Sequence, residues 1–95
     1  MHLRDELLIA RVARGDTTAF EILYDRYAAT ILGILLRILG DRNVAEALLQ
    51  ETFWQVWQKA ETYSSQSARF DSWLFRIARS LAMQDSKTRA QPRMN

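Results

Sequence analysis

The segment from residue 16 to residue 40 is DTTAFEILYDRYAATILGILLRILG. Its apolar residues recur at steps of three and four, which is the spacing of one face of an α-helix. That face carries Phe20, Leu23, Tyr24, Tyr27, Ile31, Ile34, Leu35 and Ile38, and a second apolar set comprises Ile22, Ala29, Leu32, Leu36 and Leu39. A helix that is apolar on more than one face is normally buried centrally. We therefore predict that residues 17–39 form a central helix about 35 Å long.

A shorter helix is predicted before this central one. It covers Asp5–Arg14 and stops at Gly15, because glycine favours the position that follows a helix. Asp16 or Thr17 can then cap the central helix, since both side chains accept hydrogen bonds from free backbone N–H groups.

Two more helices are predicted after it. One covers residues 43–60, with Asp41 or Asn43 as its N-cap. The other covers residues 68–87, with Ser67 as its N-cap. Their core stripes are Ala45, Leu48, Leu49, Thr52, Phe53, Val56 and Ala60 on the first, and Phe70, Trp73, Leu74, Ile77, Ala78 and Leu81 on the second. The predicted fold class is all-α, a compact bundle of about four helices.

Length and composition indicate one small domain. The chain has 95 residues, of which 48% are hydrophobic, so a core can form although the margin of stability is thin. We assign residues 1–87 to the helical domain. Residues 88–95, which include Pro92, are expected to be the start of an interdomain linker or a disordered tail.

The residues needed for most chemistry are absent from the sequence. There is no cysteine, and the single histidine is His2, so we expect neither a metal site nor any other cofactor. No phosphate-binding glycine motif occurs, and we expect a protein that is not an enzyme. No apolar run approaches the roughly 20 residues of a membrane span, and the N-terminus does not resemble a signal peptide. We therefore expect a cytoplasmic protein that does not bind membranes.

The charges are distributed unevenly. Residues 1–68 hold seven Lys/Arg and nine Asp/Glu, whereas residues 69–95 hold six Lys/Arg and two Asp/Glu. An acidic part followed by a basic part suggests two partners of different charge. The alternative is a solvated basic helix with no partner.

The helix predicted over residues 43–60 has a second face opposite its core stripe. Glu46, Gln50, Trp54, Trp57 and Glu61 follow steps of three and four, with Glu51 and Gln55 beside them. An aromatic residue surrounded by acids and amides is typical of an interface anchor, and a basic partner surface suits it. The alternative is that Trp54 lies flat over aliphatic parts of the domain.

The last helix has a basic face opposite its apolar stripe. This face comprises Arg69, Ser72, Arg76, Arg79, Ser80, Met83 and Lys87, and the preceding loop holds Tyr63, Ser64, Ser65, Gln66 and Ser67. Arginine and lysine bind phosphates, hydroxyls and amides contact base edges, and a tyrosine ring can stack on an unpaired base. These types together favour a nucleic-acid interface. Phe70 and Trp73 are assigned to the core.

Four blocks of this sequence, in this order, resemble the region-two domain of extracytoplasmic-function sigma factors. The blocks are Ala10-Arg11 through Gly15-Asp16 to Ala19-Phe20; Leu23-Tyr24-Asp25-Arg26-Tyr27; Gly40-Asp41, Ala45 to Phe53 and Val56-Trp57; and Phe70, Trp73-Leu74 and Arg76-Ile77-Ala78-Arg79. The resemblance covers about residues 7–87. The string LLQETF followed some twenty residues later by WLFRIAR is its most specific part.

The resemblance implies a promoter-specificity subunit of bacterial RNA polymerase. It implies that Glu46, Gln50, Glu51 and Trp54 of this chain contact the clamp helices of the polymerase's largest subunit. It implies that the loop from Tyr63 to Arg69 accepts a base flipped from the single-stranded non-template strand of the minus-ten element. It implies that the following helix, with Arg76, Arg79, Ser80, Met83 and Lys87, recognises the rest of that element. An anti-sigma factor is a further implied partner.

Three departures from the family pattern carry expectations. Ala47 stands where most members have an acid, which is expected to weaken core binding unless Trp54 compensates. Ser80 stands where many members have asparagine, and a hydroxyl is less selective for bases than a bidentate amide. Nothing in the sequence encodes the helix-turn-helix domain that binds the minus-35 element, so we expect an isolated domain or a piece of a longer protein.

Two rival functions are consistent with the same residues. The first is a helical protein-interaction module with no direct role in DNA binding. The second is a stand-alone regulator that binds duplex DNA through a recognition helix. Charge reversal at Arg76 and Arg79 distinguishes them, because an interaction module keeps its protein partner and has no nucleic-acid binding to lose.

Overall fold

The computed structural model describes residues 3–90, and side chains over residues 3–88. Its elements are α1 (Asp5–Val12), α2 (Thr17–Leu39), α3 (Arg42–Lys59), the short 3₁₀ helix η1 (Ala60–Thr62) and α4 (Phe70–Ala90). Within this part of the chain there is no strand. The predicted all-α bundle of four helices is therefore confirmed.

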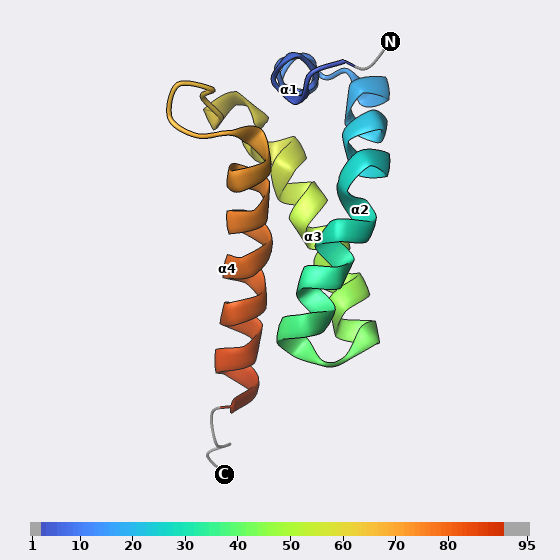
Figure 1. Cartoon of the computed structure of the whole chain (residues 1–95), viewed down its shortest axis with the longest axis vertical. Helices are drawn as coiled ribbons and strands as arrows, with labels where there is room; N and C mark the ends of the chain where they lie inside the picture. Colours follow the sequence, from blue (N-terminus) through green and yellow to red (C-terminus); the bar gives the residue numbers. More distant parts are fainter. Residues whose placement is uncertain (1–2, 91–95) are drawn as a thin grey trace.

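The three long helices pack against one another in pairs, and α1 lies across one end of α2 (Figure 1). α2 contacts α1, α3 and α4, which is the central position predicted from its two apolar faces. The loop between η1 and α4 lies at the same end of the molecule as α1 (Figure 1). The sequence segment before α2 and the segment before α4 are thus brought together.

Backbone capping explains where α2 begins and ends. The Asp16 carboxylate accepts a hydrogen bond from the Ala19 N–H at 3.1 Å, which satisfies a donor left free at the helix start. Gly40 adopts φ +68° and donates from its N–H to the Leu36 carbonyl at 2.8 Å. A left-handed residue here closes the helix, and glycine adopts this conformation without strain.

The ends of α1 and α3 differ slightly from the predictions. α1 ends at Val12 rather than Arg14, because the chain tightens into a turn in which the Gly15 N–H bonds to the Val12 carbonyl at 2.8 Å. α3 begins at Arg42 with Asp41 as its N-cap, and the Asp41 carboxylate accepts from two backbone N–H groups at 3.0 and 3.2 Å. Of the two predicted caps, Asp41 is the one used.

The core contains the apolar stripes predicted for α2, α3 and α4. Its fully buried members include Leu23, Ile31, Leu35, Phe53, Val56, Phe70, Leu74 and Ala78. The Phe20 ring packs edge-on against Phe53 and Trp57, at centroid distances of 6.2 and 5.4 Å. Thr52 is the one buried polar residue among those described, and its hydroxyl donates to the Leu48 carbonyl at 2.7 Å. Ile38, predicted to be buried, is 38% exposed in the last turn of α2.

The start of α4 corrects the prediction that Ser67 caps it. The Ser64 carbonyl accepts hydrogen bonds from the N–H groups of Ser67 and Ala68, at 3.1 and 3.2 Å. This turn uses the backbone of the serine-rich segment, so the helix begins only at Phe70, and the first bond of its ladder runs from Trp73 to Arg69. Serine-rich segments favour such local turns over helix.

The other end of α4 extends beyond the prediction. The helix runs to Ala90 instead of ending near residue 87. Residues 88–90, assigned to a linker or tail, are therefore helical. The remainder of the predicted tail, residues 91–95, and His2 lie outside the described residues.

Candidate functional site

One face of α4 carries the basic and polar side chains singled out from the sequence. Its exposed members are Ser72, Arg76, Arg79, Ser80, Met83 and Lys87, and Arg69 lies just before the helix. The opposite face is fully buried at Phe70, Leu74, Ala78 and Ala82. The structure thus places the predicted nucleic-acid residues of α4 in solvent, on the outside of the bundle.

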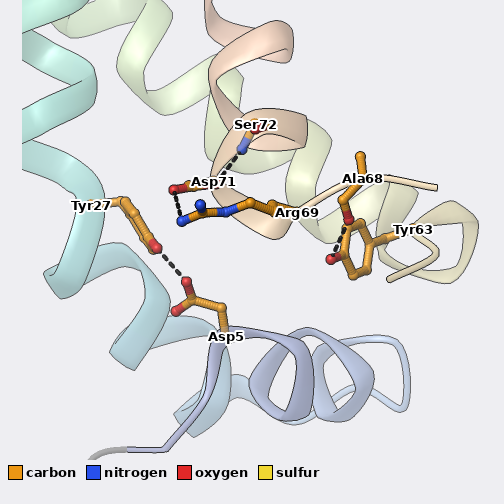
Figure 2. Close-up of polar contacts among 7 residues, drawn as sticks. All are labelled: Asp5, Tyr27, Tyr63, Ala68, Arg69, Asp71 and Ser72. Carbon is orange, nitrogen blue, oxygen red and sulfur yellow. Dashed lines mark hydrogen bonds and ion pairs between the residues drawn. The ribbon is translucent and has the colours of Figure 1, made fainter. Parts of the chain in front are cut away.

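The loop before α4 is closed by Tyr63. Its hydroxyl donates to the Ala68 carbonyl at 2.8 Å (Figure 2). Its ring packs edge-on against Phe70 and Trp73, with centroids 5.8 and 5.3 Å apart. Tyr63 is half-buried in this arrangement, and base stacking on its ring stays a prediction. The assignment of Phe70 and Trp73 to the core is confirmed, with Phe70 fully buried and Trp73 packed against the core.

The remaining loop residues are exposed. The Ser64 hydroxyl accepts a hydrogen bond from the Gln66 N–H at 3.3 Å, so this serine shapes the turn. Ser65, Gln66 and Ser67 extend the exposed surface of the loop beyond it. The loop therefore presents hydroxyl and amide groups on a backbone held in place by Tyr63.

Arg69 connects the loop to the first turn of α4. Its guanidinium contacts the Asp71 carboxylate at 3.0 Å, while its side chain remains 83% exposed (Figure 2). Exposed pairs of this kind contribute little to stability. Arg69 can therefore exchange Asp71 for a phosphate at small cost.

A small cavity lies on the other side of this loop, against α1. It has a volume of about 160 Å³ and is lined by Glu6, Ile9 and Ala10 of α1, Ala60 of η1, and Tyr63 and Ser65. One wall comes from the N-terminal helix, which sequence reasoning had not connected with the loop. Fifty residues lie between the end of α1 and Tyr63, so only the tertiary structure brings these walls together.

Asp5 ties α1 to α2 next to this cavity. Its carboxylate accepts a hydrogen bond from the Tyr27 hydroxyl (Figure 2) and one from Arg26 at 2.7 Å. Arg26 also donates to the Leu3 carbonyl at 2.8 Å. The Tyr27 ring packs near Phe70, with centroids 5.7 Å apart, at the start of α4. Asp5 and Arg26 could not be paired from the sequence, because no local spacing rule pairs residues more than twenty positions apart.

Burial raises the pKa of both tyrosines at this end of the molecule. For Tyr27, burial is the largest cause, and the hydrogen bond to Asp5 and the charge of that carboxylate raise the pKa further. For Tyr63, burial is again the largest cause, followed by the negative charges of Glu6, Asp5 and Asp71. Each effect opposes formation of a tyrosinate.

The second candidate face lies on α3. Glu46, Gln50, Glu51 and Trp54 are all exposed, and the Trp54 side chain is 54% exposed. Trp57, by contrast, is half-buried against the Phe20 ring. The two tryptophans are therefore divided between surface and core, whereas their spacing alone had placed both on the face opposite the core stripe. Glu46 pairs with Arg42 one turn earlier, at 3.2 Å.

Beside Trp54 the surface is hollowed between α2 and α3. This groove of about 380 Å³ is lined by Phe20, Tyr24, Gln50, Phe53 and Trp54. The Gln50 amide donates to the Tyr24 hydroxyl at 3.1 Å. An exposed indole beside an aromatic-lined hollow offers a partner both an apolar contact and polar groups at its edge, which is the usual composition of an interface anchor.

Comparison with known proteins identifies the family. The sequence profile of "Sigma-70 region 2" matches residues 23–91. The chain belongs to the sigma-70 region 2 family. Similar relatives are the RNA polymerase sigma-H factor of Pseudomonas aeruginosa, 37% identical over 79% of this chain and 38% of the relative, and the ECF RNA polymerase sigma-E factor of Haemophilus influenzae, 38% identical over 80% and 39%.

One solved structure and a further curated relative agree with this assignment of the sigma region 2 domain. An engineered region 2 of sigmaE, solved by NMR in complex with GTAAAA, is similar with a TM-score of 0.79 and 28% identity, over 90% of this chain and 88% of that one. The ECF sigma factor SigK of a Mycobacterium species is 33% identical over 77% of this chain and 38% of its own length. The chain thus spans somewhat more than a third of the curated relatives it matches.

The described residues of this sigma region 2 domain form neither a metal-ligand cluster nor a membrane span. Over residues 3–90, no group of three or more His, Cys, Asp or Glu side chains is arranged to hold a metal ion. In the same part of the chain, no helix combines the length and apolar character of a membrane span.

Proposed function

We propose that this domain docks on the clamp helices of RNA polymerase through α3 and recognises the minus-ten promoter element through α4 and the loop from Tyr63 to Arg69. The observation that carries the proposal is the separation of two exposed faces on one rigid bundle. The α3 face is acidic and anchored by Trp54, whereas the α4 face is basic. Such a separation lets one domain hold the polymerase and DNA together.

Docking through α3 is supported by the exposure of Gln50 and Trp54 beside the aromatic hollow. An indole that enters a partner pocket commonly contributes 2 kcal/mol or more, as a rough figure, to binding. Glu46 and Glu51 add negative charge, which steers a basic partner. We also propose an anti-sigma factor as a regulatory partner. Such a protein would block docking if it covered the α3 face, and DNA recognition if it covered the α4 face.

Minus-ten recognition is supported by the order of groups along the loop and α4. Exposed hydroxyls and an amide in the loop are followed by Arg69, Arg76 and Arg79. The engineered sigmaE domain in complex with GTAAAA has the same fold. The cavity beside the loop is small and partly apolar, with Tyr63 and Ile9 in its walls, and we propose that it or the adjoining loop surface receives an unpaired base. Flipping a base costs a few kcal/mol, so the isolated domain should bind single strands weakly and duplex more weakly still.

The docking half is tested by capture of the domain with an immobilised clamp-helix fragment. We expect Gln50→Ala and Trp54→Ala each to reduce capture, and Gln55→Ala, an α3 residue whose amide lines the groove toward α4, to leave it unchanged. Undiminished capture of both docking variants would show that α3 is not the docking face.

The DNA half is tested by fluorescence anisotropy with a labelled single-stranded oligonucleotide containing GTAAAA. We expect charge reversal at Arg76 and Arg79 to abolish binding, and wild-type affinity to fall steeply with salt because phosphate contacts dominate. Retained capture by the clamp fragment serves as the folding control. Wild-type protein that binds no oligonucleotide at low salt, yet still binds the clamp fragment, would favour the interaction module without DNA binding. Tight duplex binding at physiological salt would instead favour the stand-alone regulator.

A further inference from the structure

A groove between α3 and α4 adjoins the basic face of α4 and adds a wall from α3 that neither face assigned above includes. It has a volume of about 910 Å³. The α3 wall includes Gln55 and Lys59, and the α4 wall includes Ser80, Met83 and Lys87. Gln55, which the sequence placed beside the docking face, therefore faces α4 instead.

The charge of this groove is positive. Lys59 stands on one wall and Lys87 on the other, and no Asp or Glu is among the described residues that line it. The Lys59 ammonium donates to the Gln55 side-chain oxygen at 3.1 Å, and an i,i+4 contact of this kind holds the ammonium beside the groove. Two cations on opposite walls, with no acid between them, attract an anion.

The groove also presents apolar and uncharged polar side chains. Met83 is 65% exposed, the highest value among the large hydrophobic side chains described. A flexible thioether adapts its shape to a flat or irregular apolar partner. Ser80 adds an exposed hydroxyl, and Gln55 an amide. Phosphate, sugar and base together present the anionic, polar and apolar parts that match this set.

The groove is continuous with the basic face of α4. Ser80, Met83 and Lys87 belong to both, because they step by three and four along the helix. A strand that follows this face from Arg76 and Arg79 toward the end of α4 passes directly along the groove. The α3 wall of the groove, with Lys59, then lies within reach of that strand.

We propose that the α3–α4 groove binds the sugar-phosphate backbone of a nucleic-acid strand, with Lys59 and Lys87 as phosphate contacts, Met83 against the sugar or base, and Gln55 positioning Lys59. This inference rests on the proposed function, because it extends the DNA path of α4 onto α3. It makes α3 a helix with two roles. Its Trp54 face holds the polymerase, and its Lys59 edge contacts the promoter.

The test measures binding of the single-stranded GTAAAA oligonucleotide to the full chain across a salt series. We expect Lys59→Ala and Lys87→Ala each to make the slope of log K against log salt shallower by about 0.7, the value for one phosphate on a single strand. The double variant should change the slope by about twice as much, roughly 1.4. Arg37→Ala removes an exposed cation on α2 outside the groove and should leave the slope unchanged.

A second readout reports contact directly. The ε-methyl resonance of Met83 should shift when the oligonucleotide is added, and the shift should be lost in the Lys59/Lys87 double variant. A poly-glutamate peptide of matching charge tests for an acidic protein segment as the occupant. If that peptide moves the Met83 methyl and the oligonucleotide does not, the groove is a protein site and our inference is wrong.

The failure of this inference is distinguishable from failure of the proposed function. If the groove variants bind with wild-type affinity and slope while reversal of Arg76 and Arg79 abolishes binding, the groove assignment fails and the α4 assignment stands. If reversal of the two arginines has no effect either, the proposed DNA function fails, and the groove inference fails with it.

Discussion

The hydroxyl of Tyr27 in α2 donates a hydrogen bond to the carboxylate of Asp5 in α1. Because the Tyr27 ring also packs near Phe70, this one side chain joins the N-terminal helix to the start of α4. The loop of the proposed DNA interface lies between these two elements. The contact therefore places α1 as a wall of the cavity beside Tyr63.

Tyr27→Phe should destabilise the fold without disturbing its packing. The ring contacts remain, while a partly buried hydrogen bond to a charged group is lost, which costs about 1.5–3 kcal/mol. Urea denaturation followed by circular dichroism measures the loss. Tyr24→Phe is the matched control, because its hydroxyl contacts Gln50 at an exposed position and its removal should cost less. Equal losses in the two variants would show that Asp5 adds nothing to the Tyr27 bond.

Stability should fall at alkaline pH. The folded-state pKa values of Tyr27 and Tyr63 are raised above the ordinary value of about 10. A raised folded pKa means that the folded state keeps its proton while the unfolded chain loses it. The contribution is thus fully present below pH of about 10 and is lost as the pH rises from there toward the folded pKa. One proton held by the folded state and lost by the unfolded chain lowers the free energy of unfolding by at most about 1.4 kcal/mol per pH unit.

Denaturation at several alkaline pH values, with wild type, Tyr27→Phe and Tyr63→Phe, tests this dependence. Each variant should show a shallower decline than the wild type. A decline of unchanged steepness in Tyr27→Phe would mean that other groups cause the alkaline loss.

Ala47→Glu should strengthen docking on the clamp-helix fragment. Ala47 is exposed on α3, one helical turn before Gln50 and Glu51, where the resemblance to sigma factors places an acid. A new charge pair at an exposed interface contributes about 0.2–1 kcal/mol, or up to about fivefold in affinity. Isothermal titration at two salt concentrations measures it, with Ala47→Gln as the uncharged control. A gain of the same size in both variants would rule out charge as its cause.

Ser80→Asn should sharpen discrimination among minus-ten sequences. Ser80 is exposed on the basic face of α4, and an asparagine amide can contact an adenine edge with two hydrogen bonds, which a hydroxyl cannot do. A good bidentate contact discriminates by about 1–3 kcal/mol. Competition binding with single-base variants of the oligonucleotide measures the change. If Ser80→Asn raises the affinity for every oligonucleotide by the same factor, the added amide contacts the DNA backbone instead of a base.

Two glycines should respond to alanine in opposite directions. Gly40→Ala places a side chain at φ +68°, which costs about 1–2 kcal/mol although the site has open space. Gly33 lies exposed inside α2 with no atom near its added methyl group, so Gly33→Ala should stabilise by about 0.5–1 kcal/mol. Thermal unfolding of the two variants side by side tests both signs. A stabilising Gly40→Ala would contradict the left-handed cap.

The local structure of this protein could be predicted from short-range sequence patterns. The apolar period of α2, the capping carboxylate of Asp16 and the left-handed Gly40 act over a few residues, so all four helices and both limits of α2 were predicted correctly. The positions of Trp54 and Trp57 around one helix put both on the same face, and only the packing of Trp57 against Phe20 separated them. The prediction that Ser67 caps α4 was wrong, because the backbone of Ser67 forms a turn with Ser64 instead.

Contacts between distant segments were decided only by the tertiary structure. Asp5 accepts a hydrogen bond from Tyr27, and Lys59 lines one groove with residues of α4, because helix packing brings together residues separated by twenty positions or more. The sequence alone determined which faces of each helix are apolar, basic or acidic, since side-chain direction follows helical period. The packing of α1 against the loop and of α3 against α4 determined which of those faces meet, and so where the cavity and the basic groove lie.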